Sequence, residues 1–384
     1  MLVLDVGTLL TPFEKFSPGR VIVRGDRIEA AGAVSDVRIP HEGSQLDFPD
    51  LTLVPGFIEP HLHGCGGFDV MDATADSMNV ISRTLARYGT TSFLPTTVSA
   101  PVDVLEASVD RLAEFLRAGT AGATPLGLHL EGPFLNVQKR GTHRPANVLQ
   151  PDPNLLSRWI QRSGGLVKLL TMAPELENAG SVAELARKAE VVVAMGHSDA
   201  TFPEAIAAVE SGTRYAVHTF NAMRQFSHRD AGIVGAVLSD DRIFAEIIAD
   251  GVHVAAEVVR IFARSKGKSR FILATDATSA TGMPDGRYTL GTSQVSVQGG
   301  VCRDEEGRLA GSTLTQDRAL RNFIQWTGMR LDDALLGLTA NPAQALMLEA
   351  RGHIEPGAFA DLTLLDRDLN VARTYVGGKL VFGR

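Results

Sequence analysis

The chain has 384 residues, of which 44% are hydrophobic and 21% are charged, and its formal net charge is −7. This is the composition of an ordinary globular protein, long enough for one large core and a smaller second domain. The acidic balance argues against a nucleic acid or an anionic membrane as the main partner, because such binding relies on concentrated lysine and arginine. An anionic small substrate is still compatible with it, provided that a few basic residues lie in the pocket.

Two cysteines, Cys65 and Cys302, provide neither a disulfide framework nor a cysteine-rich zinc site, which favours a reducing compartment. The first ten residues, MLVLDVGTLL, include Asp5 and no basic residue, so they predict a strand and not a signal peptide. No apolar run reaches the roughly 18 residues of a membrane span. We therefore expect a cytoplasmic protein.

Strand and turn patterns dominate both ends of the chain. The segment VIVRGDRIEAAG contains Gly25-Asp26, and the last segment, ending TYVGGKLVFG, contains Gly377-Gly378. Each dipeptide is a hairpin signal between two strand patterns. We expect residues 1–53 and 353–384 to pair in one small β-sandwich domain beside a larger domain, residues 54–352.

From residue 53 onward, short apolar segments alternate with helical patterns. Stretches such as ADSMNVISRTLARYG, VDVLEASVDRLAEFLRAG and FPEAIAAVESG repeat apolar residues at spacings of three and four, as a helix packed on a sheet requires. Eight strand-then-helix units are the count of a (β/α)8 TIM-like barrel, an α/β fold. The eight predicted strands are residues 53–63, 91–97, 125–132, 167–175, 191–199, 215–221, 244–251 and 271–278.

Polar side chains stand at the ends of these strands, where a TIM barrel assembles its active site. A single histidine in such a place is more often a hydrogen-bonded packing residue than a metal ligand. Several together indicate a metal site, because imidazole and carboxylate are ligands that suit Zn²⁺ or a similar divalent ion. The residues are His61 and His63 on the first strand, Glu131 on the third, His197 on the fifth, His218 on the sixth and Asp276 on the eighth.

Spacing adds two further expectations. His61 and His63 are two residues apart, so both side chains point to the same face of their strand, the barrel interior. His129 shares a face with Glu131 for the same reason but lies deeper in its strand. We expect His129 to support a metal ligand and not to bind the metal itself.

These motifs resemble the amidohydrolase superfamily and, within it, the N-acetylglucosamine-6-phosphate deacetylase family. The superfamily resemblance rests on PGFIEPHLHG, on ATDA, and on NPAQAL followed by GHIEPGAFADLTLLD. The narrower resemblance rests on LHLEGPFL, RGTHRP, MGHSDA, HTFNAM, HRDAGIVG, ADGVHV and LAGST. Many superfamily members carry a carboxylated lysine at the end of the fourth strand. Here VKLLTMAPE has Lys168 near its start, so the resemblance gives that ligand place to Glu131.

The resemblance implies that Glu131, His197 and His218 hold a metal, expected to be Zn²⁺, and that Asp276 is the catalytic carboxylate. The implied reaction hydrolyses the acetamide of N-acetyl-D-glucosamine 6-phosphate to D-glucosamine 6-phosphate and acetate, in amino-sugar catabolism or cell-wall recycling. Asp276 would accept a proton from the attacking water and pass it to the departing amine. His143 would help the metal to stabilise the oxyanion. A second metal at His61 and His63 stays open, since some family members replace this pair.

The resemblance also implies substrate contacts. Arg229 is the expected phosphate ligand, because guanidinium binds phosphate bidentately, although taken alone it would be a solvated surface arginine. His253 is expected to bind sugar hydroxyls or phosphate. The other expected contacts are Thr142, His143, Asn221, Ala222, Leu309, Ala310 and Gly311. The family further suggests a homodimer whose pocket lies near the subunit interface.

Two other functions stay open at this stage. A different amidohydrolase, acting on a cyclic amide or an N-acyl amino acid, would lack a phosphate-binding arginine and would not require the 6-phosphate. A non-catalytic barrel would have lost its ligands. All the candidate ligands and Asp276 are retained in this sequence, which speaks against the second of these alternatives.

Overall fold

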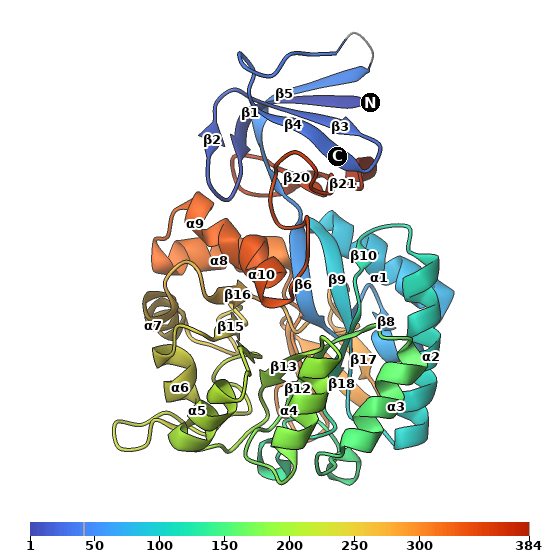
Figure 1. Cartoon of the computed structure of the whole chain (residues 1–384), viewed down its shortest axis with the longest axis vertical. Coiled ribbons are helices and arrows are strands. Elements are labelled where there is room, and N and C mark those ends of the chain that lie inside the picture. The colour runs from blue at the N-terminus through green and yellow to red at the C-terminus, as the bar shows by residue number, and fades with distance from the viewer. Residues whose placement is uncertain (41–42, 384) are drawn as a thin grey trace.

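The computed structural model describes residues 1–40 and 43–383 and contains a parallel barrel with a small sheet domain at one end (Figure 1). Strands β9 to β16, including the short edge strand β10 (Thr124–Pro125), pair in parallel with their neighbours in the sheet, and β6 pairs in parallel with β9. Backbone hydrogen bonds close the ring, from Asp276 N to His61 O at 3.0 Å and from His63 N to Ala277 O at 2.7 Å. The predicted eight-unit barrel is confirmed. Its strands are β6 (Phe57–Leu62), β9 (Thr90–Thr97), β11 (Leu128–Glu131), β12 (Val167–Met172), β13 (Val192–Met195), β14 (Tyr215–Ala216), β15 (Phe244–Ile247) and β16 (Phe271–Leu273).

One long helix follows each barrel strand. The three helical patterns quoted from the sequence correspond to α1, α2 and α5, and α1 and α5 each begin after a capping threonine, Thr74 and Thr201. No helix among the described residues is long and apolar enough to cross a bilayer. The helices are α1 (Ala75–Arg87), α2 (Val102–Ala118), α3 (Pro153–Ser163), α4 (Ala179–Lys188), α5 (Phe202–Glu210), α6 (Gly232–Ser239), α7 (Ala256–Lys266) and α8 (Gln316–Thr327), followed by the short α9 (Leu331–Leu335) and α10 (Ala340–Ala345).

The two chain ends join in the small domain, as predicted, and Figure 1 shows both termini there. Its strands form one continuous sheet in the order β22-β21-β20-β5-β1-β3-β4, with β2 beside β1. The predicted hairpin turns occur at Gly25-Asp26 and at Gly377-Gly378. The strands are β1 (Leu2–Leu10), β2 (Lys15–Phe16), β3 (Gly19–Arg24), β4 (Arg27–Ala33), β5 (Ser44–Pro55), β20 (Leu362–Leu365), β21 (Val371–Val376) and β22 (Lys379–Gly383).

The small domain packs on the amino-terminal ends of the barrel strands. The chain passes from β5 to β6 across Gly56, whose N–H donates to Asp361 O at 2.8 Å, and the Thr363 hydroxyl donates to Gly89 O at 2.8 Å. Arg351 pairs with Asp361 and donates to the hydroxyl of Ser92 at 3.1 Å. Because the barrel strands are parallel, all their carboxyl ends open at the opposite end of the barrel.

A three-stranded antiparallel sheet between β16 and α8 was not predicted. It consists of β17 (Gly286–Leu290), β18 (Ser293–Gln298) and β19 (Val301–Asp304). Its apolar face forms a cluster with Val98 and Ala310. The sheet thereby covers part of the carboxyl end of the barrel. The remaining short strands are β7 (Gly64–Cys65), β8 (Phe68–Asp69) and β10 (Thr124–Pro125).

Candidate metal centre and substrate cavity

A cavity of about 170 Å³ lies at the carboxyl ends of the barrel strands. It brings together most of the residues that the sequence predicted for the site, although they come from six different strand-to-helix connections. Those that line it are His63, Glu131, Thr142, His143, His197, His218, Asn221, Ala222, His253, Asp276, Leu309 and Gly311. The strand-end rule predicted His63, Glu131, His197, His218 and Asp276 for this volume, and the family resemblance predicted the others. Their individual roles are still predictions.

Glu131, the last residue of β11, occupies the centre of this group. Burial would raise its pKa, but the surrounding imidazoles, His61 first among them, hold the pKa of Glu131 well below its ordinary value. The carboxylate is therefore ionised, as metal binding requires. Its Oε1 lies 3.2 Å from His61 Nε2 and 3.1 Å from both His197 Nε2 and His218 Nε2, and its Oε2 lies 3.1 Å from His63 Nε2 and 3.3 Å from His143 Nε2.

The hydrogen bonds of two histidines show which ring nitrogen is free for a metal. His63 Nδ1 lies 3.2 Å from Thr96 O, and His197 Nδ1 lies 2.9 Å from Lys139 O. A carbonyl oxygen only accepts, so Nδ1 donates in both rings, and in the neutral ring that binds a metal Nε2 carries the lone pair. Both lone pairs point at Glu131, which is the arrangement of metal-ligating histidines held by a backbone carbonyl.

His61 offers a buried atom that has no hydrogen-bond partner among the described residues. Its Nε2 lies 3.2 Å from Glu131 Oε1, but the geometry is not that of a hydrogen bond. A buried polar atom without a partner is costly, and a cation would satisfy it. The residues present therefore fit a divalent metal.

The possible metal ligands form two overlapping groups. The ligand atoms of His61, His63 and Asp276 lie within 4.8 Å of one another, and so do those of Glu131, His143 and His197. His218 joins the second group, because its Nε2 lies 3.0 Å from His197 Nε2. Each group has the imidazole and carboxylate composition of a catalytic metal site.

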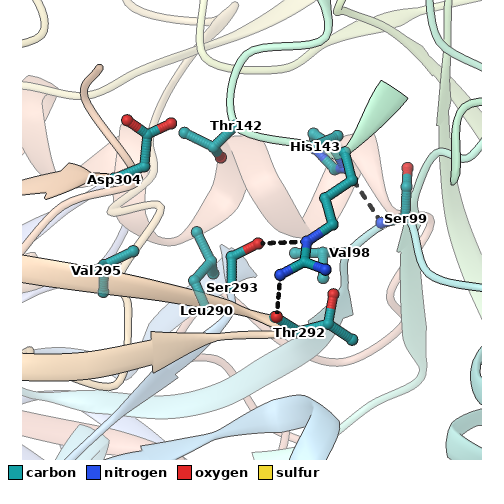
Figure 2. A pocket seen from close by; sticks show the side chains of 10 residues that line it. Val98, Ser99, Thr142, His143, Leu290, Thr292, Ser293, Val295 and Asp304 are labelled. Carbon is teal, nitrogen blue, oxygen red and sulfur yellow. Dashed lines mark hydrogen bonds between the residues drawn. The ribbon is translucent and has the colours of Figure 1, made fainter. Parts of the chain in front are cut away.

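His143 differs from the other histidines in its tautomer. The backbone N–H of Ser99 donates to His143 Nδ1 at 3.1 Å, as the dashed line in Figure 2 shows. Burial lowers the pKa of His143 although Glu131 opposes the change, so the ring is neutral and Nε2 carries its proton. His143 is therefore suited to donate a hydrogen bond into the cavity and not to ligate a metal.

His129 lies beneath the site and does not face the cavity. Its Nε2 is 2.8 Å from the Thr171 hydroxyl and its Nδ1 is 3.2 Å from the Thr96 hydroxyl. Its ring packs edge-on against His61, with 4.7 Å between the ring centroids. Both nitrogens are engaged, so His129 supports the position of His61, as expected from its depth in the strand.

The backbone is left-handed at two candidate metal ligands and at the candidate catalytic residue. The φ angles are +49° at His197, +30° at His218 and +50° at Asp276. Such angles in residues other than glycine cost roughly 1–3 kcal/mol each and concentrate at functional sites. They occur where the chain leaves a strand, and the sharp turn aims each side chain across the barrel mouth.

The backbone around Asp276 is held closely. Its Oδ1 lies 3.3 Å from His63 Nε2, and its carbonyl oxygen accepts from Ser312 N at 2.7 Å. Gly311 passes so near that a β-carbon there would lie 2.7 Å from Asp276 O. Gly311 itself has a φ of +56°, so two separate constraints require glycine in this turn.

The opposite wall of the cavity carries the groups expected to recognise a substrate. His253 Nδ1 lies 2.7 Å from Asp250 Oδ2. Burial opposes the charged ring, but the Asp250 carboxylate outweighs it and raises the pKa of His253. Val98 and Leu290 add an apolar patch that the sequence analysis missed, because only the unpredicted sheet brings Leu290 there.

Two predicted substrate contacts do not line the cavity. Arg229 is exposed on the loop before α6, and the Ala310 side chain is fully buried in the apolar cluster beneath β17–β19. A cation that the sequence analysis did not single out lies nearer. Arg140 lines an adjoining depression that shares Gly141 and Ala222 with the cavity, and its guanidinium donates to His143 O at 2.9 Å.

Comparison with known proteins adds a family match. The family model described as "Amidohydrolase family" matches residues 52–381. An N-acetylglucosamine-6-phosphate deacetylase of Vibrio furnissii is 39% identical over 86% of this chain and 83% of that protein. An N-acetylgalactosamine-6-phosphate deacetylase of Escherichia coli O157:H7 is 38% identical over 85% and 87%. A solved mutant N-acetyl-D-glucosamine-6-phosphate deacetylase of Mycobacterium smegmatis, in complex with N-acetyl-D-glucosamine-6-phosphate, has a TM-score of 0.93 at 35% identity over 99% of both chains.

Proposed function

The chain belongs to the amidohydrolase family, and on this premise we propose that it is a metal-dependent deacetylase of N-acetyl-D-glucosamine 6-phosphate. The reaction yields D-glucosamine 6-phosphate and acetate. The observation that carries the proposal is the Glu131 carboxylate, which meets five imidazoles beside Asp276 inside one cavity. The relatives that are named for this activity match the chain over most of its length, and they support the choice of substrate.

The metal of this proposal is Zn²⁺, held principally by Glu131, His197 and His218. His61 and His63, with Asp276, would hold a second ion. When bound, such an ion supplies Lewis acidity to a water molecule and to the acetamide carbonyl. The absence of thiolate ligands and the presence of an open cavity next to the donors agree with a catalytic rather than a structural site.

Asp276 is the proposed general base and acid. It accepts a proton from the water whose oxygen bonds to the carbonyl carbon, and it returns that proton to the nitrogen as the C–N bond breaks. His143 donates a hydrogen bond from its Nε2–H group to the oxyanion that forms in between. Val98 and Leu290 offer the apolar surface that an acetyl methyl group needs.

The phosphate of this proposal binds at the Asn221 and Ala222 side of the cavity, beside His253, whose pKa the Asp250 carboxylate raises. Arg229 reaches it from the partner subunit of a homodimer. Two observations support this arrangement: Arg229 is exposed and outside the cavity of its own chain, and Phe226 on the same loop is 57% exposed. An exposed aromatic next to a cation suits a contact between subunits.

The remaining organisation is proposed on similar grounds. Cys65 and Cys302 are free and buried, which agrees with a reducing cytoplasmic location. The barrel domain would comprise residues 54–352, and residues 1–53 with 353–384 would form the small domain. The end of β5 at Pro55 supports the first of these boundaries.

The decisive assay follows deacetylation of N-acetylglucosamine 6-phosphate after chelation of the metal and after its restoration. We expect activity to disappear on chelation and to return with Zn²⁺. Unphosphorylated N-acetylglucosamine should react far more slowly. Equal rates on the two substrates would point to a different amidohydrolase, and the absence of both metal and activity would point to a non-catalytic barrel.

A second substrate is favoured by one observation, the 38% identity to an N-acetylgalactosamine-6-phosphate deacetylase. The two sugars differ only in the configuration at C4, so the metal chemistry is the same for both. We propose the glucosamine epimer as the better substrate, with the higher kcat/KM. Measurement of kcat/KM for both epimers under the same metal conditions distinguishes the two assignments.

A further inference from the structure

Two glutamates lie beneath the cavity, and the proposed reaction gives neither a part. Glu59 and Glu246 are both fully buried, and neither lines the cavity. Glu246, on β15, makes three contacts. Its Oε1 accepts from the Tyr215 hydroxyl at 2.8 Å, while its Oε2 lies 2.9 Å from His61 Nδ1 and accepts from His218 N–H at 3.1 Å.

The contact with His61 decides which ring nitrogen carries the proton. A neutral imidazole can hold it on either nitrogen, but an ionised carboxylate only accepts. In the neutral ring, which is the form that binds a metal, Glu246 therefore keeps the proton of His61 on Nδ1 and leaves the lone pair on Nε2. That nitrogen is the one that faces Glu131 without a hydrogen bond, so it is free to bind a cation.

The same carboxylate also touches the other metal group. Its Oε2 accepts the backbone N–H of His218, whose φ of +30° needs support from its surroundings. The backbone N–H of Thr219 also donates to the main-chain carbonyl oxygen of Glu246 at 2.9 Å. One buried side chain on β15 thus holds the ring of a ligand on β6 and the backbone of a ligand after β14.

We propose that Glu246 is a positioning residue that holds His61 as a ligand of the second metal ion and sets how tightly that ion binds. The inference rests on the proposed metal-dependent function and goes beyond it, because Glu246 touches neither the cavity nor the metal. A carboxylate behind a ligating imidazole fixes its orientation and increases its basicity.

Glu59 provides a matched control within the same chain. It is the same residue type, equally buried and also bonded to His61, but through the main chain. Its Oε1 accepts from His61 N at 3.2 Å and from Thr275 N at 3.3 Å. Its replacement by glutamine leaves the ring of His61 untouched.

The test is a Zn²⁺ titration, with a competing chelator, of the purified full-length protein. We expect the wild type to bind two equivalents. In Glu246→Gln the dissociation constant of the weaker equivalent should rise by about 10–100-fold, the usual effect of losing a partner behind a metal ligand. The tighter equivalent should change by less than about threefold, and Glu59→Gln should leave both equivalents within about threefold of the wild type.

Three results would overturn the inference: a wild type that binds one equivalent, a Glu246→Gln variant that binds both like the wild type, or one that loses both equally. A deacetylation assay of the same wild-type preparation tests the proposed function separately. If the enzyme is active but binds one metal ion, the proposed function stands and only the inference about Glu246 is refuted. If Glu246→Gln fails to fold, the wild type still decides. NMR of zinc-loaded, ¹⁵N-histidine-labelled protein gives a further test. The imidazole N–H signal that is present in the wild type and missing from His61→Ala belongs to His61. It should come from an Nδ1 proton, and an Nε2 proton would contradict the proposal.

Discussion

The floor of the cavity and its rim are built by different parts of the barrel. The floor consists of the candidate metal ligands and Asp276, which lie at or just after strand ends and are each less than a tenth exposed: His61, His63, Glu131, His197, His218 and Asp276. The rim consists of loops and of the added β17–β19 sheet. Its expected cation, Arg229, is exposed and does not line the cavity of its own chain.

The floor and the rim therefore contribute differently to catalysis: the floor to the chemical step and the rim to substrate binding. The floor is held in place by buried hydrogen bonds, so its geometry is complete before the substrate arrives, as electrostatic preorganisation requires. In the proposed function, the rim is completed by the substrate and by a second subunit. Substitutions in the floor should therefore remove metal or lower kcat, whereas substitutions in the rim should raise KM.

The largest effect is expected from His197→Ala, which removes a metal ligand from the floor. With only three protein ligands expected for the principal ion, none is redundant, and the ion's contribution of several kcal/mol should be lost. Activity should fall by at least about 10³-fold. Metal analysis and circular dichroism of the purified variant check that the ion is lost while the fold is kept. His353→Ala, in the loop before β20, is the control, and an unchanged metal content in His197→Ala would refute the ligand assignment.

Asp276→Asn should have the next largest effect. The amide keeps the size of the side chain but cannot accept a proton, so kcat should fall by about 10²–10⁴-fold with KM nearly unchanged. Steady-state kinetics on the phosphorylated substrate measure both constants. The exposed Asp368→Asn serves as the control. A kcat near that of the wild type would show that another group moves the proton.

How much the sequence predicted follows the same division between floor and rim. His197 and His218 were found because a strand of a barrel ends at a known face, so position along the chain translates into position in space. The left-handed φ angles that aim these side chains have no signature in the sequence, since histidine tolerates them only when its surroundings hold it. Glu246 was overlooked because it is a single polar residue inside an apolar strand pattern.

The rim was predicted less well, for a physical reason. A motif such as HRDAG identifies a residue type that chemistry requires, but it does not say towards which subunit the loop points. Ala310 illustrates the same limit, because its neighbours Leu309 and Gly311 face the cavity while its own side chain packs under β17–β19.

Arg229→Ala tests the rim. We expect KM for N-acetylglucosamine 6-phosphate to rise by at least about tenfold, or roughly 1.4 kcal/mol, because a bidentate phosphate contact is lost. The slow reaction on unphosphorylated N-acetylglucosamine should change little. Arg264→Ala, an exposed arginine on α7, is the matched control. Equal losses on both substrates would make Arg229 a structural residue.

Mixing two impaired variants sharpens this test. In a heterodimer of Arg229→Ala and Asp276→Asn, one of the two cavities would combine an intact Asp276 with Arg229 of the partner subunit. Activity at low substrate concentration should therefore recover after subunit exchange. If Arg229 serves its own chain, both cavities stay defective and no recovery occurs.

The smallest effect is expected where floor and rim meet, at His253. The Asp250 carboxylate raises the pKa of His253, so the ring is charged below that raised pKa and its attraction for the phosphate is lost as the pH rises through it. In Asp250→Asn this loss should occur at lower pH, because the main group that raises the pKa of His253 is removed while burial still lowers that pKa. Near pH 7 the KM of the variant should exceed that of the wild type by about fivefold, or roughly 1 kcal/mol, and the two values should converge as the pH falls. The phosphate also titrates near pH 6, but it does so for both proteins, so the ratio of the two KM values isolates His253. A ratio that stays constant from acid to neutral pH would mean that Asp250 only shapes the loop.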